Sequence, residues 1–229
     1  MSARPLRAMA EFAASRHGVV LRSQAASFGL TSPELRVAKE RGWLTEPARG
    51  VLVVSGYPAT WEQRLAIVTA AGTARPVVSN GAGARLFTLD SFASADPELT
   101  VLRPGRITTS VADGIVVHHT TVLDPADRYI RNGLPCTTLA RTLADLGSTE
   151  SADRVRRALI SARRIHRVNP LWLQQTALRL HRPGQEGTGV LLRALRLAKC
   201  VGSMRPVCIE PAHFAQVEWI RWASVTSRH

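Results

Sequence analysis

The sequence of 229 residues has few cysteines, almost no lysine and no long hydrophobic run. No apolar stretch approaches the roughly 20 residues that a membrane-spanning helix needs, and the first residues lack the continuous apolar segment of a secretory signal. Three cysteines, Cys136, Cys200 and Cys208, form no CxxC pair, which argues against a disulfide framework and a cysteine-based zinc site. We therefore expect a cytoplasmic protein with reduced thiols and no membrane partner.

Motifs of small-molecule catalysis are also missing. There is no GxSxG elbow, no phosphate-binding GxxxxGK[ST] loop and no Cys or His spacing typical of metal ligands. His118 and His119 are adjacent in a predicted strand, where successive side chains point to opposite faces, so they are poorly placed to share a metal or a proton. Gly81 and Gly83 fit only part of a GxGxxG turn, because Leu86 occupies the third position, and close helix packing explains them better. We predict no enzyme activity, no catalytic residue, no metal and no cofactor.

Acidic residues are few relative to basic ones, since 17 Asp and Glu face 30 Lys and Arg, which gives a formal net charge of +13. Residues 1–150 hold 16 basic and 13 acidic residues, whereas residues 151–229 hold 14 and 4. A basic surface attracts phosphate and releases counterions, so this charge predicts a polyanionic partner, with nucleic acid the natural candidate. All basic residues except Lys39 and Lys199 are arginine, a bias that a GC-rich genome alone could also produce.

The N-terminal region shows the pattern of a winged helix-turn-helix. Helical patterns cover residues 5–15, 23–29 and 31–42, and extended segments follow at residues 43–45 and 50–54. Ser23 is the expected N-cap of the second helix. For the third helix, Thr31 and Glu34 fit a capping box, while Pro33 suits the first helical position if Ser32 is the cap instead.

The third helix is the predicted recognition helix. Such a helix presents polar side chains of its first turns to base edges, while flanking basic residues contact phosphates. Ser32, Arg36 and Lys39 meet this description, and Arg49 in the wing could reach a phosphate or the minor groove. Glu40 on the same face weakens the interaction electrostatically.

A second unit begins near Thr60, which forms a predicted capping box with Gln63 at the head of another helix. Strand patterns follow in "PVVS", "ELTVLRP" and "GIVVHHT", with a short helix in "GAGARLF". Helix signals return at "TTLARTLADLG", where Thr137 or Thr138 can be the cap and Gly147 is expected to end the helix.

The last recognisable pattern is a basic helix over residues 150–166, with a thin apolar stripe of Val155, Leu159 and Ile160. Its predicted secondary phosphate contacts are Arg154, Arg157, Arg163 and Arg164. Two further helices follow in "NPLWLQQTALRL" and "GVLLRALRLAK". We therefore predict an α+β fold made of a winged helix-turn-helix (1–55), a mixed α/β domain (60–147), a basic helical region (148–200) and an irregular tail (201–229).

The stretch "HGVVLRSQAASFGLTSPELRVAKERGWLTEPARGVLVV", residues 17–54, resembles the N-terminal winged helix of AbiEi-type antitoxins of type IV toxin-antitoxin systems. Arg49, Gly50 and Val51 match the wing pattern RGVY of that family, with Leu52 in place of the aromatic residue. Further along, "GLPCTTLARTLADL", residues 133–146, is similar to the middle region of actinobacterial proteins that join this winged helix to a Vsr-like endonuclease-type domain.

The sequence departs from that pattern at two places. Asn80 takes the place of the histidine that usually follows the serine of "SNGAGARLF". The nuclease-like domain needs an acidic cluster to hold a metal and activate water, yet beyond Asp153 the only acids are Glu186, Glu210 and Glu218. We therefore expect that domain to be missing and do not transfer its chemistry.

The resemblance implies an antitoxin-like transcriptional regulator that binds double-stranded operator DNA and accompanies a nucleotidyltransferase-like toxin as an indirect partner. One alternative is an inactive or truncated endonuclease-like DNA-binding protein. Another is a winged-helix protein-interaction module, which predicts that the face of Ser32, Arg36 and Lys39 is covered.

Overall fold

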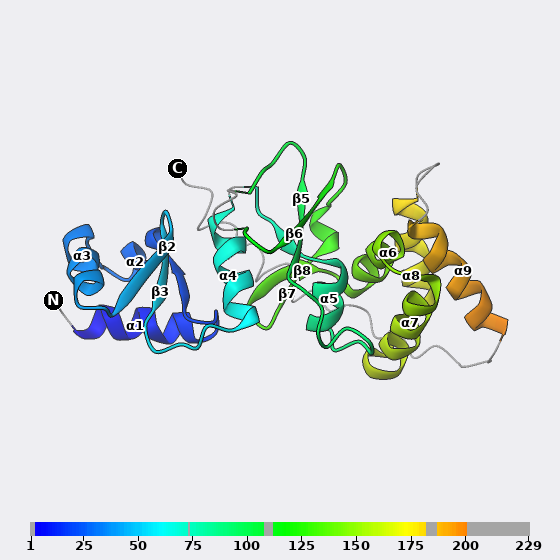
Figure 1. Cartoon of the computed structure of the whole chain (residues 1–229), viewed down its shortest axis with the longest axis horizontal. Coiled ribbons are helices and arrows are strands. Elements are labelled where there is room, and N and C mark those ends of the chain that lie inside the picture. Colours follow the sequence, from blue (N-terminus) through cyan, green and yellow to red (C-terminus); the bar gives the residue numbers. More distant parts are fainter. Residues whose placement is uncertain (1–2, 73, 108–111, 182–186, 201–229) are drawn as a thin grey trace.

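The computed structural model describes residues 3–72, 74–107, 112–181 and 187–200. Figure 1 shows an elongated molecule with a small sheet and its helices at one end, a larger sheet in the centre and a group of helices at the other end. This arrangement confirms the predicted α+β fold. No helix in these ranges is long and apolar enough to cross a bilayer. The predicted irregular tail, residues 201–229, lies outside the described residues.

The first part is a winged unit in which helices pack on a three-stranded sheet. In chain order its elements are α1 (Ala3–Ala14), β1 (Val19–Leu21), α2 (Arg22–Ser27), α3 (Ser32–Glu40), β2 (Leu44–Ala48) and β3 (Val51–Val54). The strands are antiparallel in the order β1-β3-β2, with Val19 opposite Val53. Met9, Leu35 and Leu52 belong to the core between the helices and one face of this sheet.

Thr31 is the N-cap of α3, which decides between the two predicted assignments. Its hydroxyl accepts a hydrogen bond from the Glu34 N–H at 3.4 Å, and the Glu34 carboxylate accepts one from the Thr31 N–H at 3.0 Å. The expectation for α2 is wrong, because that helix begins before Ser23. There the side chain of Gln24 accepts a hydrogen bond from the Leu21 N–H at 2.9 Å.

The central part is built on a five-stranded mixed sheet. Its elements are α4 (Trp61–Ala71), β4 (Val77–Val78), α5 (Asn80–Leu86), β5 (Glu98–Leu102), β6 (Val116–Thr120), the 3-10 helix η1 (Pro125–Asp127), β7 (Arg128–Arg131) and β8 (Leu134–Thr137). The strand order is β6-β5-β4-β8-β7. Strands β4 and β8 are parallel, as are β5 and β6, whereas β4 and β5 are antiparallel and so are β7 and β8.

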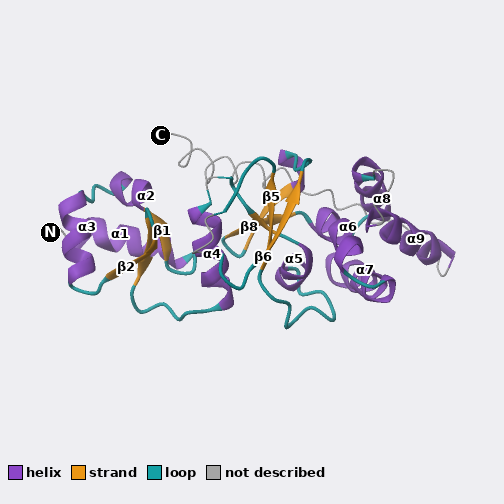
Figure 2. Ribbon diagram, turned by 45° about the horizontal axis from the view of Figure 1, so that its top comes forward, coloured by secondary structure: helices purple, strands orange, loops and turns teal. Residues whose placement is uncertain are grey.

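Helix α4 lies between the two sheets. It contacts all three strands of the winged unit as well as β4 and β8, and both Figure 1 and Figure 2 show it between them. Its buried residues Leu65 and Val68 belong to one apolar core with Val19, Val51 and Val53 of the small sheet. Because side chains alternate along a strand, these three valines lie on the face opposite α1, α2 and α3. Helix α4 therefore covers the second face of the small sheet.

The turn between β7 and β8 makes another contact between the two parts. Asn132 and Gly133 both have left-handed backbone, with φ of 50° and 74°, as expected for a tight two-residue hairpin. His17 Nε2 lies 2.7 Å from the Asn132 carbonyl oxygen. A Cβ on Gly133 would overlap the carbonyl oxygen of Ser15. Only glycine therefore fits at this position without a shift of the backbone.

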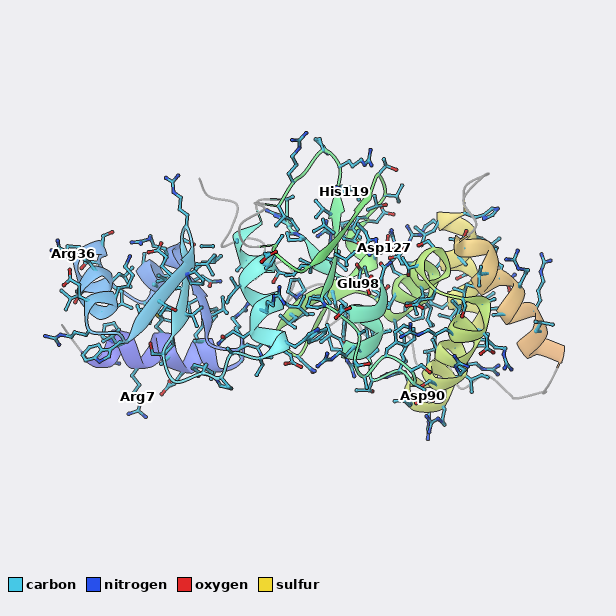
Figure 3. All side chains as sticks on the ribbon, viewed as in Figure 1. Arg7, Arg36, Asp90, Glu98, His119 and Asp127 are labelled. Atoms are coloured by element: carbon cyan, nitrogen blue, oxygen red, sulfur yellow. The ribbon has the colours of Figure 1, made fainter. Side chains whose placement is uncertain are left out.

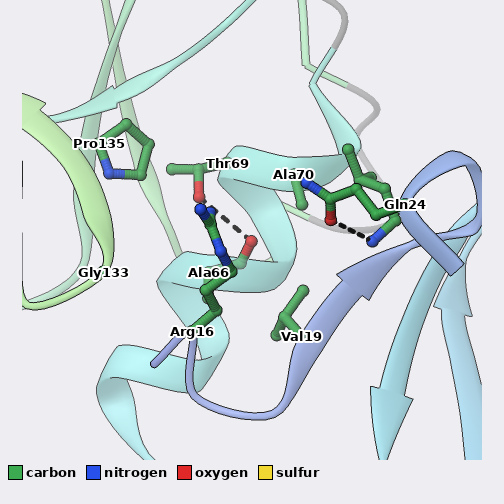
Figure 4. Close-up of a pocket in the computed structure, with 9 residues that line it drawn as sticks. Arg16, Val19, Gln24, Ala66, Thr69, Ala70, Gly133 and Pro135 are labelled. Atoms are coloured by element: carbon green, nitrogen blue, oxygen red, sulfur yellow. Dashed lines mark hydrogen bonds between the residues drawn. The ribbon is translucent and has the colours of Figure 1, made fainter. Parts of the chain in front are cut away.

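The first helix of the central part begins as predicted, but only half of its capping box forms. Thr60 accepts a hydrogen bond from the Gln63 N–H at 3.1 Å, whereas the Gln63 side chain donates to the His17 carbonyl oxygen at 2.9 Å. Nearby, Figure 4 shows a gap lined by Arg16, Thr69 and others between the winged unit and α4. Its volume of about 20 Å³ is room for a single water molecule.

The last part consists of α6 (Leu139–Thr149), α7 (Ala152–His166), α8 (Pro170–Leu180) and α9 (Gly187–Cys200). Helix α6 packs against α5, α7, α8 and α9, and Thr138 is its N-cap. The expectation that Gly147 ends α6 is wrong, because the helix continues to Thr149. A Cβ on Gly147 would overlap the Gly187 carbonyl oxygen, so this glycine allows α6 and α9 to approach closely. The predicted boundary at residue 147 thus falls within α6.

The basic helix is α7, and its apolar face differs in part from the prediction. Val155 and Leu159 are buried, but Ile160 is 51% exposed. Ala158 and Ala162 complete the buried face instead. The stripe from Val155 to Ala162 follows the i, i+3, i+4, i+7 spacing, which places Ile160 on the other side of the helix.

A buried group of ion pairs, which we call the Asp127 network, ties η1 to α6 and α8. It consists of Asp124, Asp127, Arg141, Asp145 and Arg179. Asp127 is 1% exposed; Arg141 donates to its Oδ2 at 3.1 Å, and Arg179 donates to its Oδ1. Arg141 also donates to Asp145 at 2.8 Å. Burial raises the pKa of Asp145 to about 6, even though Arg141 acts in the opposite direction.

Candidate nucleic-acid interface

The outer face of α3 carries two of the predicted contact residues. Ser32 and Arg36 are both exposed, and Figure 3 shows Arg36 at the end of the molecule farthest from α9. Glu40 lies one turn further, 3.9 Å from the Arg36 guanidinium, and both side chains are more than 60% exposed, at 63% and 74%. An exposed pair of this kind contributes at most about 1 kcal/mol, so Arg36 can exchange it for a phosphate or a base.

Lys39, the third predicted contact on α3, has a partner within the winged unit. Its ammonium lies 2.6 Å from the Glu46 carboxylate on β2. Arg22, the first residue of α2, donates to both oxygens of the same carboxylate at 2.9 and 3.0 Å, and the Gly50 N–H donates at 3.0 Å. We call this group of four residues the Glu46 cluster. It joins α2, the last turn of α3 and the wing turn at one half-buried carboxylate.

The charge of Glu46 is stabilised by its neighbours. Hydrogen bonds from Lys39 and from the Gly50 N–H, together with Arg22, lower the pKa of Glu46 from 4.5 to about 2. Glu46 and Arg22 were not among the residues predicted from the sequence. No periodic pattern in the sequence indicates that they meet. Glu46 lies in a short hairpin, and its strand pairing is irregular between Thr45 and Ala48.

Replacing Glu46 with Gln should lower the stability of the winged unit in a pH-dependent way. The folded pKa lies below the ordinary value, so the carboxylate stabilises the fold above pH 4.5, and this contribution is lost as the pH falls towards about 2. We expect Glu46→Gln to cost about 1–3 kcal/mol at pH 7 and clearly less at pH 3. Urea unfolding at both pH values measures this, with exposed Glu40→Gln as control. An equal cost at both pH values would contradict the role of the charge.

Arg49 lies in the wing turn between β2 and β3. It is exposed and has no hydrogen-bond or ion-pair partner among the described residues. At the other side of α3, the Arg41 guanidinium lies 5.2 Å from the centre of the Trp43 ring, which is 45% exposed. This pair was not among the contacts predicted from the sequence. An exposed arginine above a tryptophan ring is a suitable group for a phosphate contact.

The predicted secondary phosphate contacts on α7 lie far from α3, at the opposite end of the molecule (Figure 1). Three of them already bind carboxylates: Arg154 pairs with Glu150, Arg157 with Asp153 and Arg164 with Asp90. Asp90 is labelled at that end in Figure 3. Arg163 is half-buried and has no carboxylate partner among the described residues. The structure therefore does not bring the α3 and α7 arginines onto one surface.

Other polar residues noted in the sequence lie in the central part. His118 Nε2 lies 2.9 Å from Glu98, whereas His119 is exposed, as expected for neighbours on a strand. Glu98 also accepts the Gly81 N–H at 3.1 Å, and a Cβ on Gly81 would come within 2.5 Å of it. The close neighbour of this glycine is thus a side chain of β5 and not another helix. Asn80, His118 and His119 line a polar cavity beside α6. Within the described ranges, no group of three His, Cys, Asp or Glu side chains could hold a metal.

The arrangement of α1, α2 and α3 on the sheet β1-β3-β2, with a wing turn at residues 49–50, defines a winged helix-turn-helix unit. Residues 7–55 match the family model described as "Transcriptional regulator, AbiEi antitoxin". This match confirms the resemblance for the winged unit.

No curated protein matches the chain. The crystal structure of the RV2827C protein from Mycobacterium tuberculosis is similar over 90% of this chain and 85% of that chain, with 17% sequence identity and a TM-score of 0.42.

Proposed function

We propose that this protein is an antitoxin-like transcriptional regulator that binds double-stranded operator DNA through α3 and the wing, without catalysing a reaction. The family description of residues 7–55 supports the regulatory role. The observation that carries DNA binding is the exposure of Arg36 on α3 and Arg49 at the wing, two cations that no described residue neutralises strongly. Residues 1–55 hold eight basic and four acidic residues, so the unit as a whole attracts phosphate.

Within this proposal the contacts differ in kind. Ser32 and Arg36 lie in the first turns of α3, where side chains of a recognition helix meet base edges. Arg49 would contact a phosphate or the minor groove, and Arg41 beside Trp43 a phosphate at the far end of the helix. A toxin, if one accompanies this protein, would be affected indirectly through its transcription.

Replacing Arg36 or Arg49 with Ala should weaken DNA binding. We expect Arg36→Ala to lower the affinity for a duplex enriched from a random pool by about tenfold and to relax its sequence preference. Arg49→Ala should reduce the slope of log affinity against log salt concentration by about 1. Fluorescence anisotropy at several salt concentrations measures both effects.

Arg7→Ala is the matched control for these variants. Arg7 is also an exposed arginine with a glutamate four residues later, Glu11 at 2.9 Å, but it lies on α1, and Figure 3 shows it on a different face from Arg36. Equal losses for Arg7→Ala and Arg36→Ala, or binding that does not change with salt, would contradict the proposal.

Two alternatives make different predictions, one about the structure and one about the activity of the purified protein. The protein-interaction alternative predicts a covered α3 face, yet no described part of this chain covers Ser32 or Arg36. The endonuclease-like alternative predicts nicking of supercoiled plasmid when a divalent metal is added.

A further inference from the structure

The Glu46 cluster bears directly on how the winged unit would bind DNA. One carboxylate, 18% exposed, accepts hydrogen bonds from two cationic side chains and from the wing backbone. Lys39 and Arg22 are themselves only 33% and 39% exposed. A phosphate that recruits either cation must therefore compete for it with a carboxylate that is already well bound.

The same cluster also helps to position Arg36 on α3 and Arg49 at the wing, the two cations that remain available for DNA. Lys39 lies on the last turn of α3, and the Gly50 N–H lies beside Arg49 at the wing turn, so both are tied to Glu46. Glu46 therefore links the recognition helix to the wing turn, in addition to the core that α3 shares with β2 and β3. Fixed spacing of contact groups favours one DNA sequence and shape over others, whereas extra mobile cations strengthen binding to any phosphate backbone.

We infer that Glu46 is a specificity-determining residue, which holds α3 and the wing in register and keeps Lys39 and Arg22 from contacting phosphates of non-operator DNA. The inference rests on the proposed DNA-binding function. It gives Lys39 the role of a positioning residue in place of the predicted direct contact, and it assigns the direct contacts on α3 to Ser32 and Arg36.

The test compares Glu46→Gln with wild type and with Glu40→Gln. Both variants remove one negative charge from the same unit, but Glu40 is 63% exposed and lies outside the Glu46 cluster. The probes are the enriched duplex and a scrambled duplex of equal length, each titrated over a range of salt concentrations by fluorescence anisotropy.

For Glu46→Gln we expect the affinity for the scrambled duplex to rise about tenfold, with a salt slope steeper by about 1–2, because one or two cations are released. The affinity for the enriched duplex should rise less or fall, so that the ratio of the two affinities decreases. Glu40→Gln should change both affinities by similar, smaller factors. Equal behaviour of the two variants would overturn the inference.

Lys39→Gln provides a second test that does not require Glu46→Gln to fold. If Lys39 is held by Glu46 in the complex, its removal should leave the salt slope on the scrambled duplex unchanged. A slope smaller by about 1 would show that Lys39 contacts a phosphate directly, which overturns the inference while leaving DNA binding intact. Absence of salt-dependent binding by the wild type would instead overturn the proposed function, and the inference with it.

Discussion

Replacing Asp127 with Ala is expected to lower the free energy of unfolding by about 3–5 kcal/mol. Asp127 is almost fully buried and holds two arginines, Arg141 from α6 and Arg179 from α8. Its removal leaves the Arg141 guanidinium, itself 5% exposed, with one carboxylate fewer in a place where little water can replace it. Loss of one partner of a buried ion pair is costly for this reason, even where the intact pair adds little net stability.

Urea unfolding followed by circular dichroism measures this effect, and the midpoint of thermal unfolding should fall by on the order of 10 °C. Asp124→Ala is the matched control, because Asp124 also binds Arg179 but is 54% exposed. Its loss should cost less than about 1 kcal/mol. Similar costs for the two variants would show that the Asp127 network is not a buried one in solution.

Gly133→Ala should have the second largest effect, about 2–5 kcal/mol. An alanine at φ of +74° costs about 1–2 kcal/mol by itself. The added Cβ would also overlap the Ser15 carbonyl oxygen, and moving the backbone apart costs a further 1–3 kcal/mol or so. The shift would loosen the contact between the β7–β8 turn and the winged unit, including the approach of His17 to Asn132.

Gly29→Ala separates the two contributions, since Gly29 has φ of +86° but open space where a Cβ would be. It should cost only the backbone part. Urea unfolding of both variants gives the difference, and faster amide hydrogen exchange near His17 in Gly133→Ala would locate it at the contact. A Gly133→Ala cost no larger than that of Gly29→Ala would contradict the close approach seen here.

Local signals in the sequence predicted the elements of the winged unit well. The capping box of Thr31 and Glu34 and the glycine after α3 depend on residues within a few positions of each other, so they can be recognised without knowing the fold. The arginines could also be identified from the sequence, but the carboxylates that they pair with could not. Glu46 and Lys39 meet across the connection between α3 and β2, and Asp90 and Arg164 are 74 residues apart, and no periodic pattern reports either contact.

The errors along the rest of the chain have the same origin. Gly147 was expected to end a helix because glycine often does so, yet here it is needed by a neighbouring helix, α9. Ile160 was assigned to the buried stripe on hydrophobicity alone, while two small alanines fill that face because α6 and α9 lie close to it. Contacts between helices determine where α6 ends and which residues of α7 are buried. Such contacts cannot be predicted from the local pattern of a single sequence.

The position of α4 means that the segment matching the family shares a hydrophobic core with the chain that follows it. The match ends at residue 55, six residues before α4 begins at Trp61. A fragment cut there would present Val19, Val51 and Val53 to water, because Leu65 and Val68 of α4 normally cover them. Sequence similarity thus stops in the middle of a hydrophobic core, so a transplanted winged unit would need α4, or a substitute for it, to cover the second face of its sheet.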